Sequence, residues 1–155
     1  MITSREVLTR ADKLIAKYKS RDPFRIAKQC GIELIIKELG ALKGFYKVIY
    51  RNPFIFLNKS LSRSEARLVC AHELGHHVLH REFAAFGFEE TSLFSPASRR
   101  EYEANLFAAE LLIADDEIRE LAEGGYTVEQ IAAAICMDTT LTGMKLAALQ
   151  AKNAK

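Results

Sequence analysis

The sequence is organised around the stretch Ala71-His72-Glu73-Leu74-Gly75-His76-His77-Val78-Leu79-His80, which contains all four histidines of the chain. Two of them, His72 and His76, flank Glu73 in the pattern H-E-x-x-H. Residues four apart lie about one turn along the same helix face, so both imidazoles can bind one metal ion. A zinc ion held by neutral imidazoles lowers the pKa of its water to roughly 7. Glu73 is then placed to accept that proton as a general base.

The composition limits the class of protein. A chain of 155 residues is long enough for one domain with its own core. A hydrophobic content of 49% with 27% charged residues excludes disorder, and a net charge of +2 gives no argument for nucleic acid or a membrane surface. No apolar run reaches the roughly 20 residues of a transmembrane helix, and no signal peptide is recognisable. We therefore expect a cytoplasmic protein whose cysteines are buried free thiols: Cys30, Cys70 and Cys136.

The residues before the histidines predict two helices and three strands. Apolar side chains at helical spacing predict a helix over 4–19, and Asp22-Pro23 opens a short helix that Gly31 ends. Strands are expected at 32–36, 44–50 and 54–58. The short turn between the last two makes them an antiparallel hairpin, with the first strand alongside.

The histidines lie on a predicted helix of about 18 residues that opens with the capping box at 62–65. Measured from His72 at 100° per residue, His76 falls at about 40°, on the apolar face, where an imidazole needs a partner. His77, at about 140°, is expected to face solvent. His80, at about 80°, competes as a third ligand or as a group behind a ligand. Both interpretations of His80 stay open.

Two neighbouring features are less specific. Gly75 costs helix stability, which suggests that another element closely approaches the backbone at that turn. Residues 81–95 lack periodicity, and a loop of this length in a small domain is often functional or mobile.

A second helix, expected from Ser95-Pro96 to about residue 114, supplies a candidate third ligand. Glu101 and Asn105 share its apolar face, and a carboxylate there is costly unless it is paired or bound to metal. Residues 98–101 also match a capping box, which is the competing interpretation of Glu101, although the proline start favours a ligand. The other acidic residues of this helix fall on the opposite side, Glu103 and Glu110.

Three short helices are predicted after residue 114, and the last two resemble a helix-turn-helix. The second of that pair carries only Lys145 as a basic residue in its body, too little for phosphate contacts, so a packing role is expected rather than direct nucleic-acid binding. The chain is predicted to form one domain over 1–155, with a core over 1–114 and a helical segment over 115–151. The fold class is α+β, with a three-stranded, mostly antiparallel sheet against the H-E-x-x-H helix.

These motifs together predict metal-assisted peptide hydrolysis. His72, His76 and Glu101 would be three ligands and leave a fourth position for water, as in a catalytic zinc site. Asn105 is expected to hydrogen-bond a ligand, and Glu73 would activate the water and later protonate the leaving amine. Candidate donors for stabilising an oxyanion cannot be ranked: Tyr46, Tyr50, Tyr102 and Tyr126.

The motifs resemble the ImmA/IrrE family of zinc metallo-endopeptidases. The resemblance extends from Asp22-Pro23 through the H-E-x-x-H motif to Glu101-x-x-x-Asn105-x-Phe107-Ala108-Ala109-Glu110-Leu111-Leu112. It implies a small zincin-like domain, Zn²⁺ held by His72, His76 and Glu101, and Glu73 as the base. Family members commonly have Met-Pro after the Leu-Leu pair, where Ile113-Ala114 stands here, away from the ligands.

The resemblance also implies a cytoplasmic bacterial or prophage protease that cuts a helix-turn-helix repressor and so relieves repression. Two alternatives stay open. One is a non-catalytic regulatory module that binds a repressor or DNA and keeps a structural metal, for which Glu73 would be unnecessary. The other is a hydrolase of a small amide. A groove beside the third strand would favour a peptide, because an edge strand can pair with an extended backbone.

Overall fold

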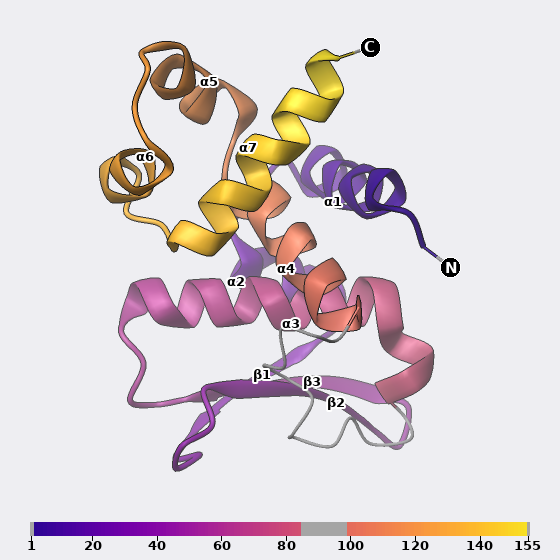
Figure 1. Cartoon of the computed structure of the whole chain (residues 1–155). Helices are drawn as coiled ribbons and strands as arrows, with labels where there is room; N and C mark the ends of the chain where they lie inside the picture. Colours follow the sequence, from indigo (N-terminus) through magenta and orange to yellow (C-terminus); the bar gives the residue numbers. More distant parts are fainter. Residues whose placement is uncertain (1, 85–98, 155) are drawn as a thin grey trace.

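The fold is described by a computed structural model for residues 2–84 and 99–154, and it is α+β as predicted. Figure 1 shows the order of the elements along the chain. Within the described residues these elements are α1 (Ser4–Tyr18), α2 (Pro23–Gln29), β1 (Glu33–Lys37), β2 (Gly44–Ile49), β3 (Asn52–Asn58), α3 (Arg63–Ala84), α4 (Arg99–Leu112), α5 (Asp115–Glu123), α6 (Val128–Ala134) and α7 (Thr139–Asn153).

The helices start where side chains satisfy their free amide groups. At α3 the Ser62 hydroxyl accepts from the Glu65 amide, and the Glu65 carboxylate accepts from the Ser62 amide. Asp22 caps α2, which has proline in its first turn. These starts are confirmed, and α3 is 22 residues long, somewhat longer than expected. The predicted start of α4 at Ser95-Pro96, and Ser98 with it, lies outside the described residues.

The sheet is mixed and has the strand order β1-β3-β2. β2 and β3 form the predicted antiparallel hairpin, whose turn residues Tyr50 and Arg51 have φ angles of 48° and 68°. β1 pairs with β3 in parallel, so the expected antiparallel arrangement holds for the hairpin only. β3 is therefore the central strand, with both sides already paired. The open groove beside the third strand that would favour a peptide is therefore not available for strand pairing, because β1 and β2 are the edges.

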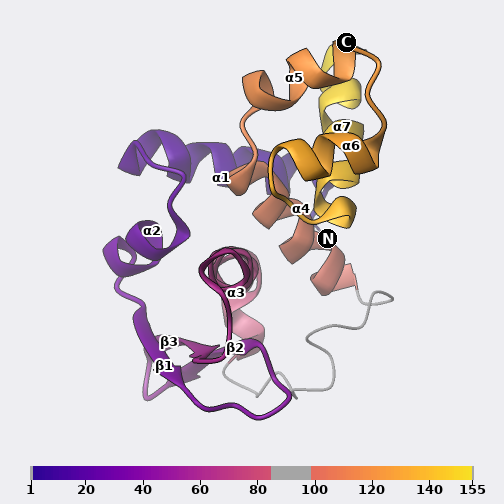
Figure 2. The same ribbon diagram turned by 90° about the vertical axis from the view of Figure 1, so that its left-hand side faces the viewer.

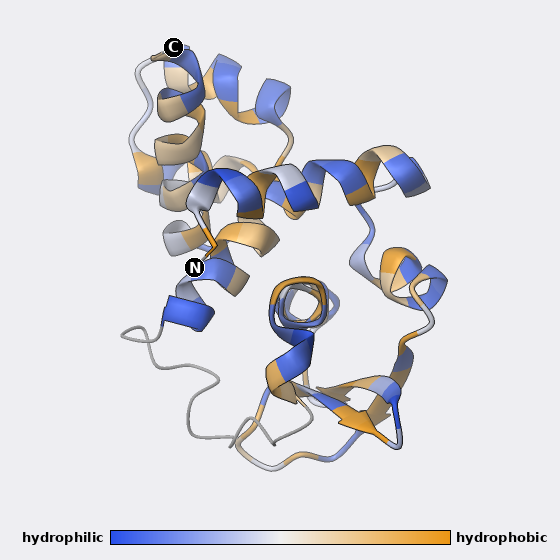
Figure 3. Ribbon diagram, turned by 90° about the vertical axis from the view of Figure 1, so that its right-hand side faces the viewer, coloured by the Kyte–Doolittle hydropathy of each residue, from blue (hydrophilic) through white to orange (hydrophobic). Residues whose placement is uncertain are grey.

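Helix α3 lies at the centre of the molecule. In Figure 2 it is seen end-on between the sheet and the layer of α1 and α4. It packs on α4, β2, β3 and α2, while α4 packs in turn on α1 and α7. Figure 3 shows this central helix carrying both hydrophobic and hydrophilic segments. Because neighbours surround α3 on several sides, the polar residues in its central part lie inside the protein together with apolar ones: His72, Glu73, His76 and His80.

Gly75 is a point of close approach between α3 and α4. A Cβ atom at this position would lie 3.2 Å from both the Cα atom and the carbonyl oxygen of Ala104, and 3.2 Å from the Phe107 ring. A backbone cannot rotate away as a side chain can. The predicted close approach at Gly75 is confirmed, and it brings the two helices that carry the candidate site together.

Gly75→Ala is expected to destabilise the protein. Overpacking costs about 1–3 kcal/mol, which outweighs the gain of about 1 kcal/mol from replacing glycine in a helix. The matched control is Gly143→Ala in α7, where the new Cβ meets only a Val128 methyl group at 3.8 Å. That variant should be more stable than wild type by about 0.5–1 kcal/mol. Urea unfolding measures both, and two changes of the same sign would contradict the packing argument.

A buried charge cluster attaches α7 to α4. Lys145 is 1% exposed, and its Nζ donates to Glu110 at 2.7 Å and to Asp115. Lys152 donates to the other Glu110 oxygen, also at 2.7 Å. Burial raises the pKa of Glu110, but the hydrogen bonds from both lysines outweigh it and lower the pKa. Glu110 falls opposite the most apolar face of α4, as predicted, but this side of the helix is also buried because α7 packs on it.

The cysteines are free, but they differ in burial. Cys70 is buried and Cys30 half-buried, whereas Cys136 is exposed in the turn before α7, contrary to the prediction.

No single helix in the described part of the chain is long and apolar enough to cross a bilayer. Only α6 and α7 taken together, bent by 110°, reach that length and composition.

Candidate metal centre

Three side chains from α3 and α4 converge on one point. His72 Nε2 lies 2.9 Å from one Glu101 oxygen, and His76 Nε2 lies 2.9 Å from the other. One ligand atom from each of the three residues lies within 4.8 Å of the other two. All three are buried, at 6%, 1% and 2% exposure. Two imidazole nitrogens and a carboxylate oxygen form a donor set that zinc accepts, so the residues fit a metal ion.

Asn105 sets the protonation of His72. Its Oδ1 lies 2.7 Å from His72 Nδ1. An amide oxygen only accepts, so the imidazole carries a proton on Nδ1, and Nε2 is the nitrogen that faces Glu101 and would bind a metal ion. Glu101 and Asn105 are one helical turn apart on α4, which is why the same helix presents a candidate ligand and the group that orients another.

The electrostatics of the site follow from burial and from Glu101. Burial lowers the pKa of His76 to about 4, although the Glu101 hydrogen bond opposes this, so the imidazole is neutral at physiological pH. Burial also lowers the pKa of His72, but the hydrogen bond and charge of Glu101, with the charge of Glu73, raise it above its ordinary value. A proton and a metal ion therefore compete for His72.

Glu73 lies inside the protein beside His72 with no exposed surface. Within the described chain, neither of its carboxylate oxygens has a partner at hydrogen-bond geometry. Burial raises the pKa of Glu73 to about 7, while the charge of His72 and the backbone of Tyr46 act in the opposite direction. A carboxyl group with a pKa close to neutrality can both accept and return a proton, as a general base and acid must.

His80 lies behind His76 and away from Glu101. Its Nδ1 is 3.0 Å from His76 Nδ1, and its Nε2 is 2.8 Å from a carboxylate oxygen of Glu103. Both ring nitrogens are therefore engaged, and His80 is not among the residues whose ligand atoms converge. The backbone of α3 leaves helical geometry at His80, with φ −131° and ψ 19°. The geometry favours a group behind a ligand over a third ligand.

Two residues of this region are more buried than the sequence indicates. Glu103 falls opposite the most apolar face of α4, as predicted, but it is buried at 6% exposure and contacts His80. His77 was expected to face solvent, but it is half-buried and its Nδ1 lies 2.8 Å from the Tyr46 hydroxyl. That hydroxyl is thus already engaged, and the other three candidate tyrosines are exposed or line a different surface: Tyr50, Tyr102 and Tyr126.

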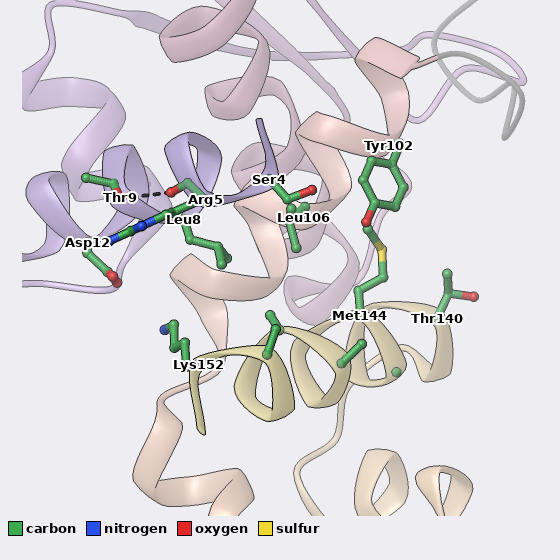
Figure 4. A pocket seen from close by; sticks show the side chains of 14 residues that line it. Ser4, Arg5, Leu8, Thr9, Asp12, Tyr102, Leu106, Thr140, Met144 and Lys152 are labelled. Atoms are coloured by element: carbon green, nitrogen blue, oxygen red, sulfur yellow. Dashed lines mark hydrogen bonds between the residues drawn. The ribbon is translucent and has the colours of Figure 1, made fainter. Parts of the chain in front are cut away.

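Two hollows lie near this region. A pocket of about 260 Å³ is lined by His72 and Asn105 together with apolar residues such as Leu68 and Leu141. A larger groove of about 830 Å³ runs between α1, α4 and α7 (Figure 4). Tyr102 of α4 lines that groove, which contains none of the converging ligands. The smaller pocket is the one that adjoins the candidate site.

A buried histidine pair four residues apart, a glutamate from the next helix and a free carboxyl group beside them are the features of a metallopeptidase-like α+β domain. Comparison with known proteins agrees with this class. The model of the Peptidase_M78 family, described as the IrrE N-terminal-like domain, matches residues 27–142. The chain belongs to this ImmA/IrrE family of metallopeptidases.

Two relatives show how the family resemblance extends along the chain. An immunity region protein of Bacillus phage phi105 is 38% identical over 121 residues, covering 77% of this chain and 76% of the relative. Metallopeptidase ImmA of Bacillus subtilis is 27% identical over 148 residues, covering 93% of this chain and 86% of the relative. The match to ImmA therefore includes the C-terminal helices as well as the candidate site.

Proposed function

We propose that this protein is a zinc-dependent endopeptidase in which His72, His76 and Glu101 hold the metal and Glu73 is the catalytic base. The observation that carries the proposal is the convergence of these three buried side chains next to the buried carboxyl group of Glu73, which has no hydrogen-bond partner among the described residues. Asn105 would orient His72, and His80 would support His76 from behind.

The chemistry divides between the metal and Glu73. A bound zinc ion would supply Lewis acidity toward a carbonyl group and acidify a water molecule. Glu73 would take the proton of the attacking water on its carboxylate and return it to the nitrogen of the leaving amine. Burial of the surrounding residues keeps bulk water away from the carboxylate and so makes these charges more effective.

The sheet supports a peptide as the substrate. β2 is an edge strand, and Tyr46 on this strand has its backbone beside Glu73. An extended peptide could pair with the free side of β2 by main-chain hydrogen bonds and bring a carbonyl group near the base. A relative named for a phage immunity region supports a transcriptional repressor of the helix-turn-helix type as the protein that is cut. Free thiols are typical of the cytoplasm, where such a repressor acts.

The test is a cleavage assay with the helix-turn-helix repressor encoded nearest this gene. Zinc-loaded protein is incubated with the purified repressor, and the products are identified by mass spectrometry. We expect two fragments from one cut, with no cutting after chelation and restored cutting when zinc is returned. An intact repressor, incubated with protein that demonstrably holds one zinc ion, would contradict the proposed substrate. Cleavage of a small amide alone would indicate a different hydrolase.

A further inference from the structure

A chain of hydrogen bonds runs from His76 away from the candidate metal position. His76 Nδ1 is 3.0 Å from His80 Nδ1, and His80 Nε2 is 2.8 Å from Glu103 Oε2. The second Glu103 oxygen accepts from Arg99 Nε at 2.8 Å. His80 and Glu103 are 2% and 6% exposed, so these contacts are shielded from water.

In the metal-bound protein, the direction of each hydrogen bond in this chain is determined by Glu103. Arg99 only donates and an ionised carboxylate only accepts, so the oxygen of Glu103 that faces His80 takes a proton from His80 Nε2. A neutral His80 then has a bare Nδ1, which accepts from His76 Nδ1. His76 thereby keeps its Nε2 lone pair for a metal ion, which would replace the hydrogen bond that Nε2 otherwise donates to Glu101 at 2.9 Å.

If these hydrogen bonds ran in the opposite direction, His76 could not bind a metal ion. If His80 carried its proton on Nδ1, His76 Nδ1 would have to accept, and the proton of a neutral His76 would move to Nε2. A protonated Nε2 cannot bind a metal ion, because the lone pair is already used. The acceptor at Glu103 therefore selects the tautomer that His76 needs.

We propose that Glu103 and His80, with Arg99 at the outer end, are positioning residues that hold His76 in its metal-binding tautomer and raise the affinity for zinc. The proposal rests on the proposed function in taking His76 as a ligand. It gives α4 two tasks, since Glu101 would bind the metal directly while Glu103, two residues later, acts on a ligand through His80.

Arg99, at the outer end of this series of hydrogen bonds, is held by the N-terminal segment. Arg99 Nη2 donates to the Ile2 carbonyl oxygen at 2.7 Å, just before α1 begins. Arg99 is itself 56% exposed, so water can replace part of its contribution. Its effect on zinc affinity should therefore be smaller than that of Glu103, whose carboxylate has no comparable access to water.

The experiment measures zinc affinity by competition with a chromophoric chelator in full-length variants. Glu103→Ala should bind zinc about 10–100-fold more weakly, the usual effect of losing a partner of a metal-binding histidine. Glu103→Gln should fall between Glu103→Ala and wild type, because its amide oxygen still accepts from His80. Arg99→Gln should weaken binding less than Glu103→Ala. This order separates hydrogen-bond acceptance from the mere filling of space.

Two controls match these variants. Asp116→Ala removes an exposed carboxylate that forms an ion pair with Arg119 in α5. It should leave zinc affinity unchanged. Ile131→Val trims the core in α6, which packs mainly on α7 and α5, and lowers stability. If Glu103→Ala binds zinc as tightly as these controls, the positioning role is overturned. If Glu103→Ala does not fold, Glu103→Gln against the same controls decides.

The tautomers give a second readout that is independent of activity. Four histidines make a long-range ¹H–¹⁵N correlation spectrum assignable. In zinc-loaded wild type we expect His80 protonated on Nε2 and His76 on Nδ1, and a His80 proton on Nδ1 would overturn the proposal. The outcomes also separate it from the proposed function. If the repressor is cleaved but zinc affinity does not change in the Glu103 variants, only the positioning role of Glu103 and His80 is refuted. If zinc affinity falls in these variants but the wild-type protein cleaves no repressor, only the peptidase function is refuted.

Discussion

Replacing Glu73 by Gln should reduce peptide hydrolysis by about 10²–10⁴-fold, the range that a general base contributes. Glutamine fills nearly the same volume but cannot accept the proton of an attacking water. The carboxyl group of Glu73 has no hydrogen-bond partner within the described residues, so its replacement breaks no ion pair that supports the fold. Initial rates of repressor cleavage, measured with wild type and variant at equal zinc content, give the result.

Zinc binding is the essential control for Glu73→Gln. The variant should hold one zinc ion with near wild-type affinity, because the three converging ligand groups are elsewhere. A rate loss together with intact metal binding identifies a catalytic role. Full cleavage by Glu73→Gln would instead favour the non-catalytic or structural-metal interpretation, since a structural site has no use for this carboxyl group.

The elements nearest the candidate site were predictable because local rules determine them. Histidines four apart on one apolar face must both point inward, and both are buried. The same rule applied to Glu101 and Asn105 placed them on one face of α4, where they contact His72 and His76. Capping residues fixed most helix starts. Such signals depend on neighbours within a few residues, which a sequence displays directly.

The sequence does not reveal how many other helices and strands pack around a given helix. Assigning side chains to faces at 100° per residue assumes that a helix has one buried face, but α4 packs on α3, α1 and α7 at once. Glu103 and Glu110 therefore lie inside the protein although they fall opposite the most apolar face, and each has a charged or imidazole partner. The signal in the sequence was His80, the last of the four histidines, which needs its own partner once it is buried one turn beyond His76.

The sheet order was hidden for a related reason. A short turn specifies the β2–β3 hairpin, because the two strands are adjacent in sequence. The position of β1 is not specified locally, because either strand of the hairpin could accept it at its free side. β1 takes the free side of β3, which makes β2 the edge strand next to α3. This long-range choice determines which strand a peptide could reach.

Replacing Glu101 by Ala should abolish stable zinc binding and with it all peptidase activity. The variant removes one of three candidate ligands, so the loss of affinity should exceed the about 10–100-fold expected for a group behind a ligand. Zinc at about 100 times its Kd should stabilise the wild-type protein by about 2.7 kcal/mol. In Glu101→Ala that zinc-dependent rise in Tm should disappear, and metal analysis after gel filtration should find no bound zinc.

Comparison of Glu101→Ala with His80→Ala decides between the two candidate third ligands. His80 contacts His76 and Glu103 with its two ring nitrogens, whereas the Glu101 oxygens face the Nε2 atoms of both His72 and His76. His80→Ala should therefore still bind one zinc ion at saturation, only more weakly. Glu120→Ala on exposed α5 controls for the loss of a carboxylate. Stoichiometric zinc in Glu101→Ala together with none in His80→Ala would reverse the assignment, and His80 would then be the ligand.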